Sequence, residues 1–134
     1  MVQDVGVNID ASDLVQSFVI ACSDETSALS TGQKVVFRMP YAFTLTAVRA
    51  SVTTAGTGSV ITVDIDESGS SILSTKITID PSEKSSTTGA TQPVISDSSL
   101  ADDAEIIITI DTVDSGGAGK GLKVTMIGYK TTVG

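Results

Sequence analysis

Between residues 43 and 79, apolar side chains recur at every second position in three short stretches. The stretches cover residues 43–47, 61–65 and 75–79. A period of two is typical of a half-buried β-strand, because successive side chains of a strand point to opposite faces of the sheet. The joints between the stretches are rich in Gly, Ser and Thr, which favour tight turns. The segment therefore predicts three consecutive antiparallel strands, that is, a β-meander.

Further candidate strands lie on both sides of this segment. We expect a strand at 17–22, which contains an apolar run, and alternating strands at 35–39 before the segment and at 105–111 and 122–127 after it. Seven or eight short strands separated by turn residues are typical of an antiparallel two-sheet sandwich. The prediction is an all-β fold, a single jelly-roll-like β-sandwich over residues 16–134 that follows a short N-terminal arm at 1–15.

Within the strand at 43–52 the apolar positions change phase. They are the odd-numbered residues up to Ala47 and the even-numbered residues from Val48 onward. One extra residue near Ala47 and Val48 would return the apolar side chains to the core, so we expect a β-bulge or a bend there. The alternative is a strand whose second half is buried on both faces.

Two long polar segments connect the predicted strands. Residues 80–93 have little to bury and predict a surface crossover, with a possible short strand at 84–88 and with Val94, Ile95 and Leu100 fixing it to the core. Residues 114–121 predict a flexible hairpin loop between the last two strands. Its Gly-rich sequence is not a phosphate-binding loop, because Lys120 is followed by Gly121 and a strand rather than by Ser or Thr and a helix.

The sequence offers no recognisable catalytic machinery. It has no His, which removes the commonest general base and zinc ligand, and its one cysteine, Cys22, lies in an apolar stretch and predicts a buried side chain. Asp64 and Asp66 share a strand face beside Glu67, and are interpreted as solvent-facing acids, with a calcium site or a hydrolase as weaker alternatives. A second acidic cluster, Asp102, Asp103 and Glu105, is interpreted as a solvated turn, with an ion site as the alternative. We expect neither an enzyme nor a cofactor.

The net charge of the chain limits the classes of molecule that it can bind. The chain has 16 acidic and 8 basic residues, a net charge of −8 that repels nucleic acid and anionic lipid. Arg38 and Arg49, the two arginines, either pair with acids across strands or anchor an interface. The sequence shows no export signal and no membrane-spanning stretch, so we expect synthesis in the cytoplasm.

The arm at 1–15 is the least committed part of the chain. Its apolar residues alternate over a short stretch, and a weak helix start follows at 10–15. An isolated arm of this kind frays, so it is held either by a neighbouring chain, which we favour, or by its own domain. The candidate partner contacts are Val5, Val7, Ile9, Leu14 and Val15.

Several of these stretches together resemble a known module. They are FRMPYAFTL at 37–45, VRA at 48–50, TVDI at 62–65, GSSILS at 69–74 and LKVT at 122–125. Over about residues 17–130 the chain resembles a β-sandwich module of tailed-bacteriophage virion proteins, which occurs in head decorations, head fibres and tail fibres. The resemblance provides no catalytic residues to look for.

The resemblance implies a small accessory protein of the virion. Because no long shaft sequence surrounds the module, it implies a capsid decoration (cement) protein on the capsid exterior, which binds the major capsid protein and stabilises the head by contact alone. Such families are often homotrimers. The alternative is a tail- or head-fibre module that binds host glycan, for which Tyr41 and Tyr129 are the available aromatic platforms in a chain without Trp.

Overall fold

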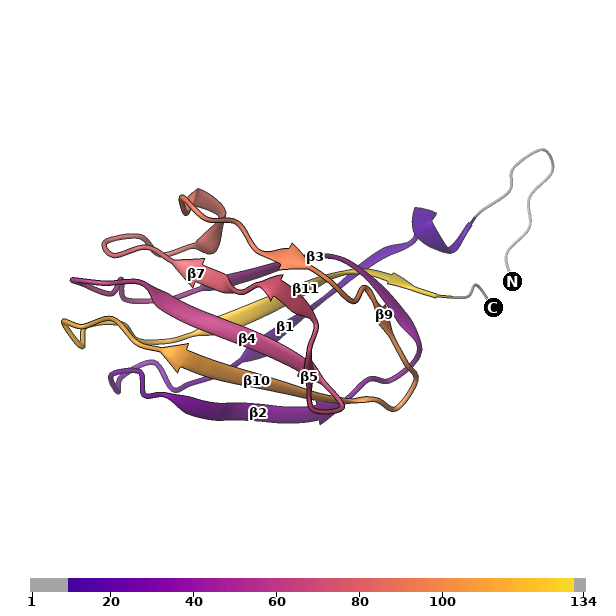
Figure 1. Cartoon of the computed structure of the whole chain (residues 1–134), viewed down its shortest axis with the longest axis horizontal. Coiled ribbons are helices and arrows are strands. Elements are labelled where there is room, and N and C mark those ends of the chain that lie inside the picture. The colour runs from indigo at the N-terminus through magenta and orange to yellow at the C-terminus, as the bar shows by residue number, and fades with distance from the viewer. Residues whose placement is uncertain (1–9, 132–134) are drawn as a thin grey trace.

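The structure is a computed structural model that describes residues 10–131. Two antiparallel sheets carry the long strands (Figure 1), in the orders β1-β11-β3-β9 and β2-β10-β4-β5, with β7 also paired to β4. A small third sheet joins β6 and β8. The strands are β1 (Val15–Ala21), β2 (Gly32–Arg38), β3 (Phe43–Ser51), β4 (Ile61–Glu67), β5 (Ser70–Ser71), β6 (Leu73–Thr75), β7 (Ile77–Ile79), β8 (Val94–Ile95), β9 (Ser99–Leu100), β10 (Glu105–Thr112) and β11 (Lys123–Lys130).

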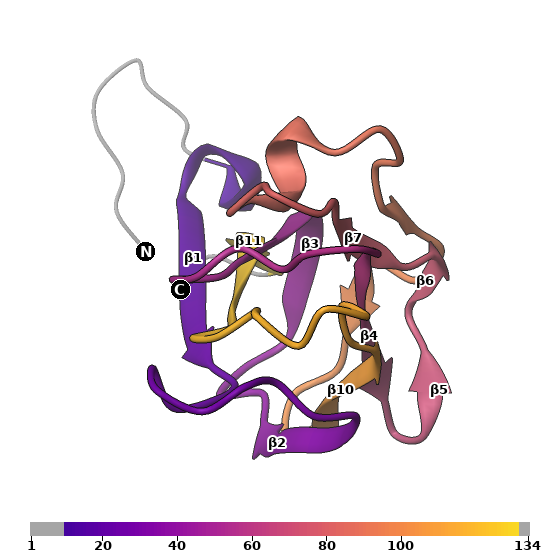
Figure 2. The ribbon, with the colours of Figure 1, turned by 90° about the vertical axis from the view of Figure 1, so that its left-hand side faces the viewer.

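The two large sheets form a β-sandwich with jelly-roll connectivity. Along the chain, β1, β3, β9 and β11 belong to one sheet, and β2, β4, β7 and β10 belong to the other. Seen from one end, β1, β11 and β3 lie in one layer and β2, β10 and β4 in the second (Figure 2). This arrangement confirms the predicted all-β sandwich, and eight strands exchanged between two sheets are the mark of a jelly roll.

An aliphatic core fills the space between the layers. The core is built from the alternating side chains of the strands. In β10, for example, Ile106, Ile108 and Ile110 are fully buried, whereas the residues between them are partly exposed. In β11, Val124 and Met126 do the same. Burial of one such side chain stabilises the fold by about 1.5–3 kcal/mol. Within residues 10–131, no helix is long and apolar enough to cross a membrane.

The predicted β-bulge is present in β3. The register with β11 pairs Ala47 with Ile127 and Leu45 with Gly128, so Thr46 is the extra residue and has no partner in β11. Leu45 and Val48 are both buried, whereas Thr46 is exposed. The change of phase in the sequence thus reflects a bulge within one sheet, not a strand buried on both faces.

The predicted meander at 43–79 is wrong. β3 and β4 belong to different sheets, and β4 pairs with β10, β5 and β7. Only the pairing of β4 with β7, at Ile61–Ile79 and Val63–Ile77, follows the prediction. Alternation locates a strand and its buried face but not its neighbour, and the joint at 52–60 is long enough to cross the roughly 10 Å between packed sheets.

The expected hairpin at 114–121 is wrong for the same reason, because β10 and β11 lie in opposite sheets. The connecting segment is organised by Asp114, whose side chain is buried. Its carboxylate accepts hydrogen bonds from the backbone N–H groups of Thr57 and Ala118, both at 2.9 Å, and of Gly119 at 3.3 Å. Burial alone would raise the pKa of Asp114, but these donors favour the ionised form and hold that pKa below its ordinary value.

We predict that Asp114→Asn lowers the free energy of unfolding by about 2 kcal/mol at pH 7, because the amide group cannot accept from all three donors. A lowered pKa in the folded state contributes stability above the ordinary aspartate pKa and loses it as the pH falls. The difference between wild type and variant should therefore shrink below about pH 4. Urea unfolding at pH 7 and pH 3 measures this difference in the free energy of unfolding. An equal difference at the two pH values would contradict the stabilising role of the ionised Asp114 carboxylate.

The segment at 80–93 follows the surface as expected, but residues 84–88 form no strand. A 3₁₀ helix, η2 (Ser86–Thr88), occupies this place, and the Ser85 side chain accepts from the N–H of Thr87. Of the residues expected to fix the crossover, Leu100 is buried, Ile95 packs against the core and Val94 is half exposed. Short polar residues favour such local bonds over a sheet ladder.

Candidate binding surface

The four edges of the two large sheets differ in how well they are protected from other chains. An edge strand exposes unpaired N–H and C=O groups that can pair with a second chain, and proteins block such edges with short strands, charges, Pro or bulges. β5, β7 and β9, which lie at two of the edges, have two or three residues each. β2 carries Lys34 and Arg38. The outermost strands at three of the edges are therefore short or charged.

The fourth edge, β1, has none of these features. It is seven residues long, contains no charged residue and no Pro, and pairs with β11 in unbroken register from Val15 to Ala21. Its other side has no strand partner within residues 10–131. On its outer face Val15 is 68% and Val19 66% exposed, and Leu14 just before it is 47% exposed. We call Leu14, Val15 and Val19 the β1 patch.

Aromatic packing fixes β1 to the sandwich. The Phe18 ring lies 5.2 Å from the ring of Phe43 and 6.4 Å from that of Tyr41, measured between centroids. The Tyr41 hydroxyl donates a hydrogen bond to the side-chain oxygen of Gln16, and the Lys130 ammonium group lies 5.3 Å from the Tyr41 ring centre. These contacts anchor the β1 edge to the sandwich, and the Tyr41 ring already contacts Phe18 and Lys130.

The structure places the predicted contact residues as follows. Leu14 and Val15 form the beginning of the β1 patch, after the 3₁₀ helix η1 (Ala11–Asp13). Val5, Val7 and Ile9 lie outside the described residues. Val19 was not among the predicted contacts, although residues 15–21 are without charge and include Val19 in an apolar run.

The interpretation of Asp64 as solvent-facing is wrong. Asp64 is buried, and its carboxylate accepts from the Ser71 hydroxyl at 2.6 Å, while Lys76 Nζ lies 3.7 Å from it. Lys76 also pairs closely with Asp111. The segment after β4 turns back and covers this part of the strand, which a period-two pattern cannot reveal. Lys76 therefore balances a cluster of acids that includes Asp66 on the same strand.

No set of three or more Cys, Asp or Glu side chains in the described part of the chain is arranged to hold a metal ion. The third acid of the β4 group, Glu67, accepts from the N–H of Ala101 at 2.8 Å. In the other cluster, Asp103 occupies a turn with a φ of 60°, and its carbonyl accepts from Arg38. Within residues 10–131 neither arginine forms an ion pair.

Asp66 opposes folding at neutral pH. Burial, and then the negative charges of Asp64 and Asp111, raise the pKa of Asp66 above its ordinary value. A raised pKa in the folded state means that stability is present at low pH and is lost as the pH rises through it. We predict that Asp66→Asn raises the free energy of unfolding at pH 7 by less than about 1 kcal/mol, because Asp66 is partly exposed and screened.

The gain should disappear at pH 3, where the carboxyl is protonated in both states. Urea unfolding at pH 7 and pH 3 measures this gain in the free energy of unfolding, and Asp102→Asn, in an exposed turn, is the control. A loss of stability at pH 7 would show that the Asp66 charge is favourable instead.

Cys22 is buried as predicted. Burial raises the pKa of its thiol to about 11, against a smaller lowering by the backbone at Val124. The thiol donates weakly to the carbonyl of Ile20 at 3.4 Å. At neutral pH the side chain is a protonated, unreactive hydrophobe.

Comparison of this chain with protein-family models, with curated proteins and with solved structures found no match. The surface of the protein is therefore the basis for inferring its function.

Proposed function

We propose that this protein is a structural component of a tailed-phage virion, a decoration protein that binds the outer surface of the capsid and stabilises the head by non-covalent contacts. The observation that supports the proposal is the β1 edge, an uncharged and regular edge strand with an exposed apolar patch on an otherwise acidic domain. An edge of this kind requires a partner, because left open it promotes aggregation.

The mechanism is strand addition together with apolar burial. A segment of the major capsid protein, or of a second copy in the trimer implied by the family resemblance, pairs with the free side of β1 and covers the β1 patch. Many copies on one head act in parallel, so a modest contact at each site still reinforces the shell. The net charge of −8 suits a protein that faces outward rather than one that contacts packaged DNA.

A fibre module that binds host glycan is the second candidate. Jelly rolls also occur in lectin domains, so the connectivity supports both classes. A sugar site needs an exposed aromatic face, whereas Tyr41 packs against Phe18 and Phe43 and Tyr129 is half buried. We therefore place it second. Saturable binding to one structure on a host-polysaccharide array would reverse this order.

An add-back experiment tests the decoration role. Particles from a phage whose copy of this gene is disrupted are mixed with the purified chain, separated by sedimentation and assayed for bound protein. We expect saturable binding to heads and a higher temperature of genome release. Heads that take up no protein would refute the proposed function.

A further inference from the structure

The edge of β3 is open over a short interval between two covered stretches. At its start, β9 pairs with Phe43 and Thr44, and the N–H of Leu45 donates to the carbonyl of Ser98 at 2.8 Å. Further along, the N–H of Ala50 donates to the Ser86 hydroxyl oxygen at 3.0 Å. In the described part of the chain, no strand pairs with this edge between Leu45 and Ala50.

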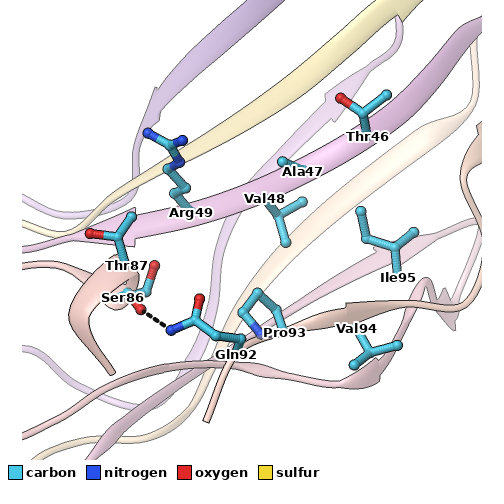
Figure 3. A pocket seen from close by; sticks show the side chains of 10 residues that line it. All are labelled: Thr46, Ala47, Val48, Arg49, Ser86, Thr87, Gln92, Pro93, Val94 and Ile95. Atoms are coloured by element: carbon cyan, nitrogen blue, oxygen red, sulfur yellow. Dashed lines mark hydrogen bonds between the residues drawn. The ribbon is translucent and has the colours of Figure 1, made fainter. Parts of the chain in front are cut away.

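A cavity of about 550 Å³ occupies this interval. Figure 3 shows β3 from Thr46 to Arg49 on one side and the segment from Gln92 to Ile95 on the other. The Gln92 side-chain amide donates to the carbonyls of Ser86 at 3.1 Å and Gly89 at 2.9 Å, which holds the second wall in place. We call this cavity the β3 slot.

The β3 slot presents main-chain groups. The backbone N–H and C=O groups of successive residues in a strand point alternately to its two sides. The N–H of Ala50 points to the slot side, because it donates to the Ser86 hydroxyl. The N–H and C=O of Val48, two residues earlier, therefore point into the slot as well. Four residues of β3 line it, a length of about 13 Å, so it accepts a segment of four or five extended residues.

The side chains of the slot define what that segment must contain. Ala47, Pro93, Val94 and Ile95 are apolar, and Val94 is 51% exposed. Arg49 is the single charged residue of the lining and makes no ion pair within residues 10–131. The slot thus fits an extended segment with small apolar side chains at alternate positions and an acid near one end.

We propose that residues 4–8, within the first nine residues of a neighbouring copy, occupy the β3 slot. In their sequence, DVGVN, Val5 and Val7 alternate with Gly6 and Asn8, and Asp4 is the acid at one end. The described chain begins at Asp10, just before η1, which contacts β11. β1 follows η1 and lies at the opposite edge of the sheet from the slot, with β11 between β1 and β3.

Such an exchange links copies through β-strand addition and gives the proposed self-association a second contact besides the β1 edge. The inference rests on that self-association but not on the capsid assignment. A test with purified protein, without phage particles, can therefore refute the exchange of arms between copies independently of the capsid assignment.

Cysteine crosslinking of full-length chains tests the proposal. Val7→Cys and Val94→Cys are made in separate chains, mixed and oxidised, and disulfides are identified by mass spectrometry; Cys22 stays inert because it is buried. The control replaces Val94→Cys with Val60→Cys, at another exposed valine. We expect the 7–94 disulfide between chains to form at least tenfold faster than the 7–60 disulfide.

Two outcomes would overturn the proposal. Equal rates for the two pairs would show that the arm does not enter the slot. A 7–94 disulfide formed only within one chain, when both substitutions are in the same molecule, would show that each arm fills its own slot. Loss of the intermolecular 7–94 disulfide on adding Gly6→Pro, which disturbs an extended pairing segment, would support the strand-addition mode.

Discussion

Gly128→Val should destabilise the fold by about 3 kcal/mol or more, although valine is one of the best strand formers. A Cβ at Gly128 would lie 2.0 Å from the carbonyl oxygen of Thr44 and 2.7 Å from a ring carbon of Phe43. The bulge at Thr46 brings β3 this close to β11. Because the nearest atom is backbone, the contact cannot be relieved by a change of rotamer.

Urea unfolding of the purified variant measures this effect. Gly69→Ala is the control, because Gly69 has a φ of 89° but a Cβ added there would meet no atom within 4 Å. It should lose only about 1 kcal/mol from backbone strain. A Gly128→Val variant as stable as the wild type would mean that the bulge does not bring the two backbones together as described.

Val19→Lys should weaken binding to heads at least tenfold while leaving the fold intact. The substitution places a charge in the β1 patch, on an edge strand, and natural edge strands carry Lys to prevent pairing. Tenfold corresponds to about 1.4 kcal/mol of binding free energy. Because Val19 is 66% exposed, its replacement should change the free energy of unfolding by less than about 0.5 kcal/mol.

Val36→Lys on β2 is the matched control. Val36 is 54% exposed and lies on an edge strand that already carries Lys34 and Arg38. Its binding to heads in the add-back assay should equal that of the wild type. If both variants bind like the wild type, the β1 edge is not the contact surface.

Local alternation predicts the strands themselves but not how they are paired. The change of phase at Ala47 and Val48 is sufficient to predict the bulge, because burial on one face imposes it. β1 and β2 begin at Val15 and Gly32, earlier than the expected 17 and 35. Those extra residues are paired by neighbouring strands, and a pattern within one strand does not contain this information.

The pairing and the binding surface depend on contacts between distant parts of the chain. The crossing of 52–60 and 113–122 between sheets, and the burial of Asp64 beneath a later segment, follow from tertiary packing. Leu14 and Val15 stand out in the sequence as apolar residues near a terminus. That β1 is an edge strand, and an unprotected one, can be learned only from the order of strands in the sheet.

Immunogold labelling of purified virions with an antibody against this chain tests the central claim most directly. The decoration role predicts gold particles distributed over the heads in electron micrographs. Gold confined to the tails would favour the glycan-binding fibre module, and virions without any gold would contradict the virion assignment itself.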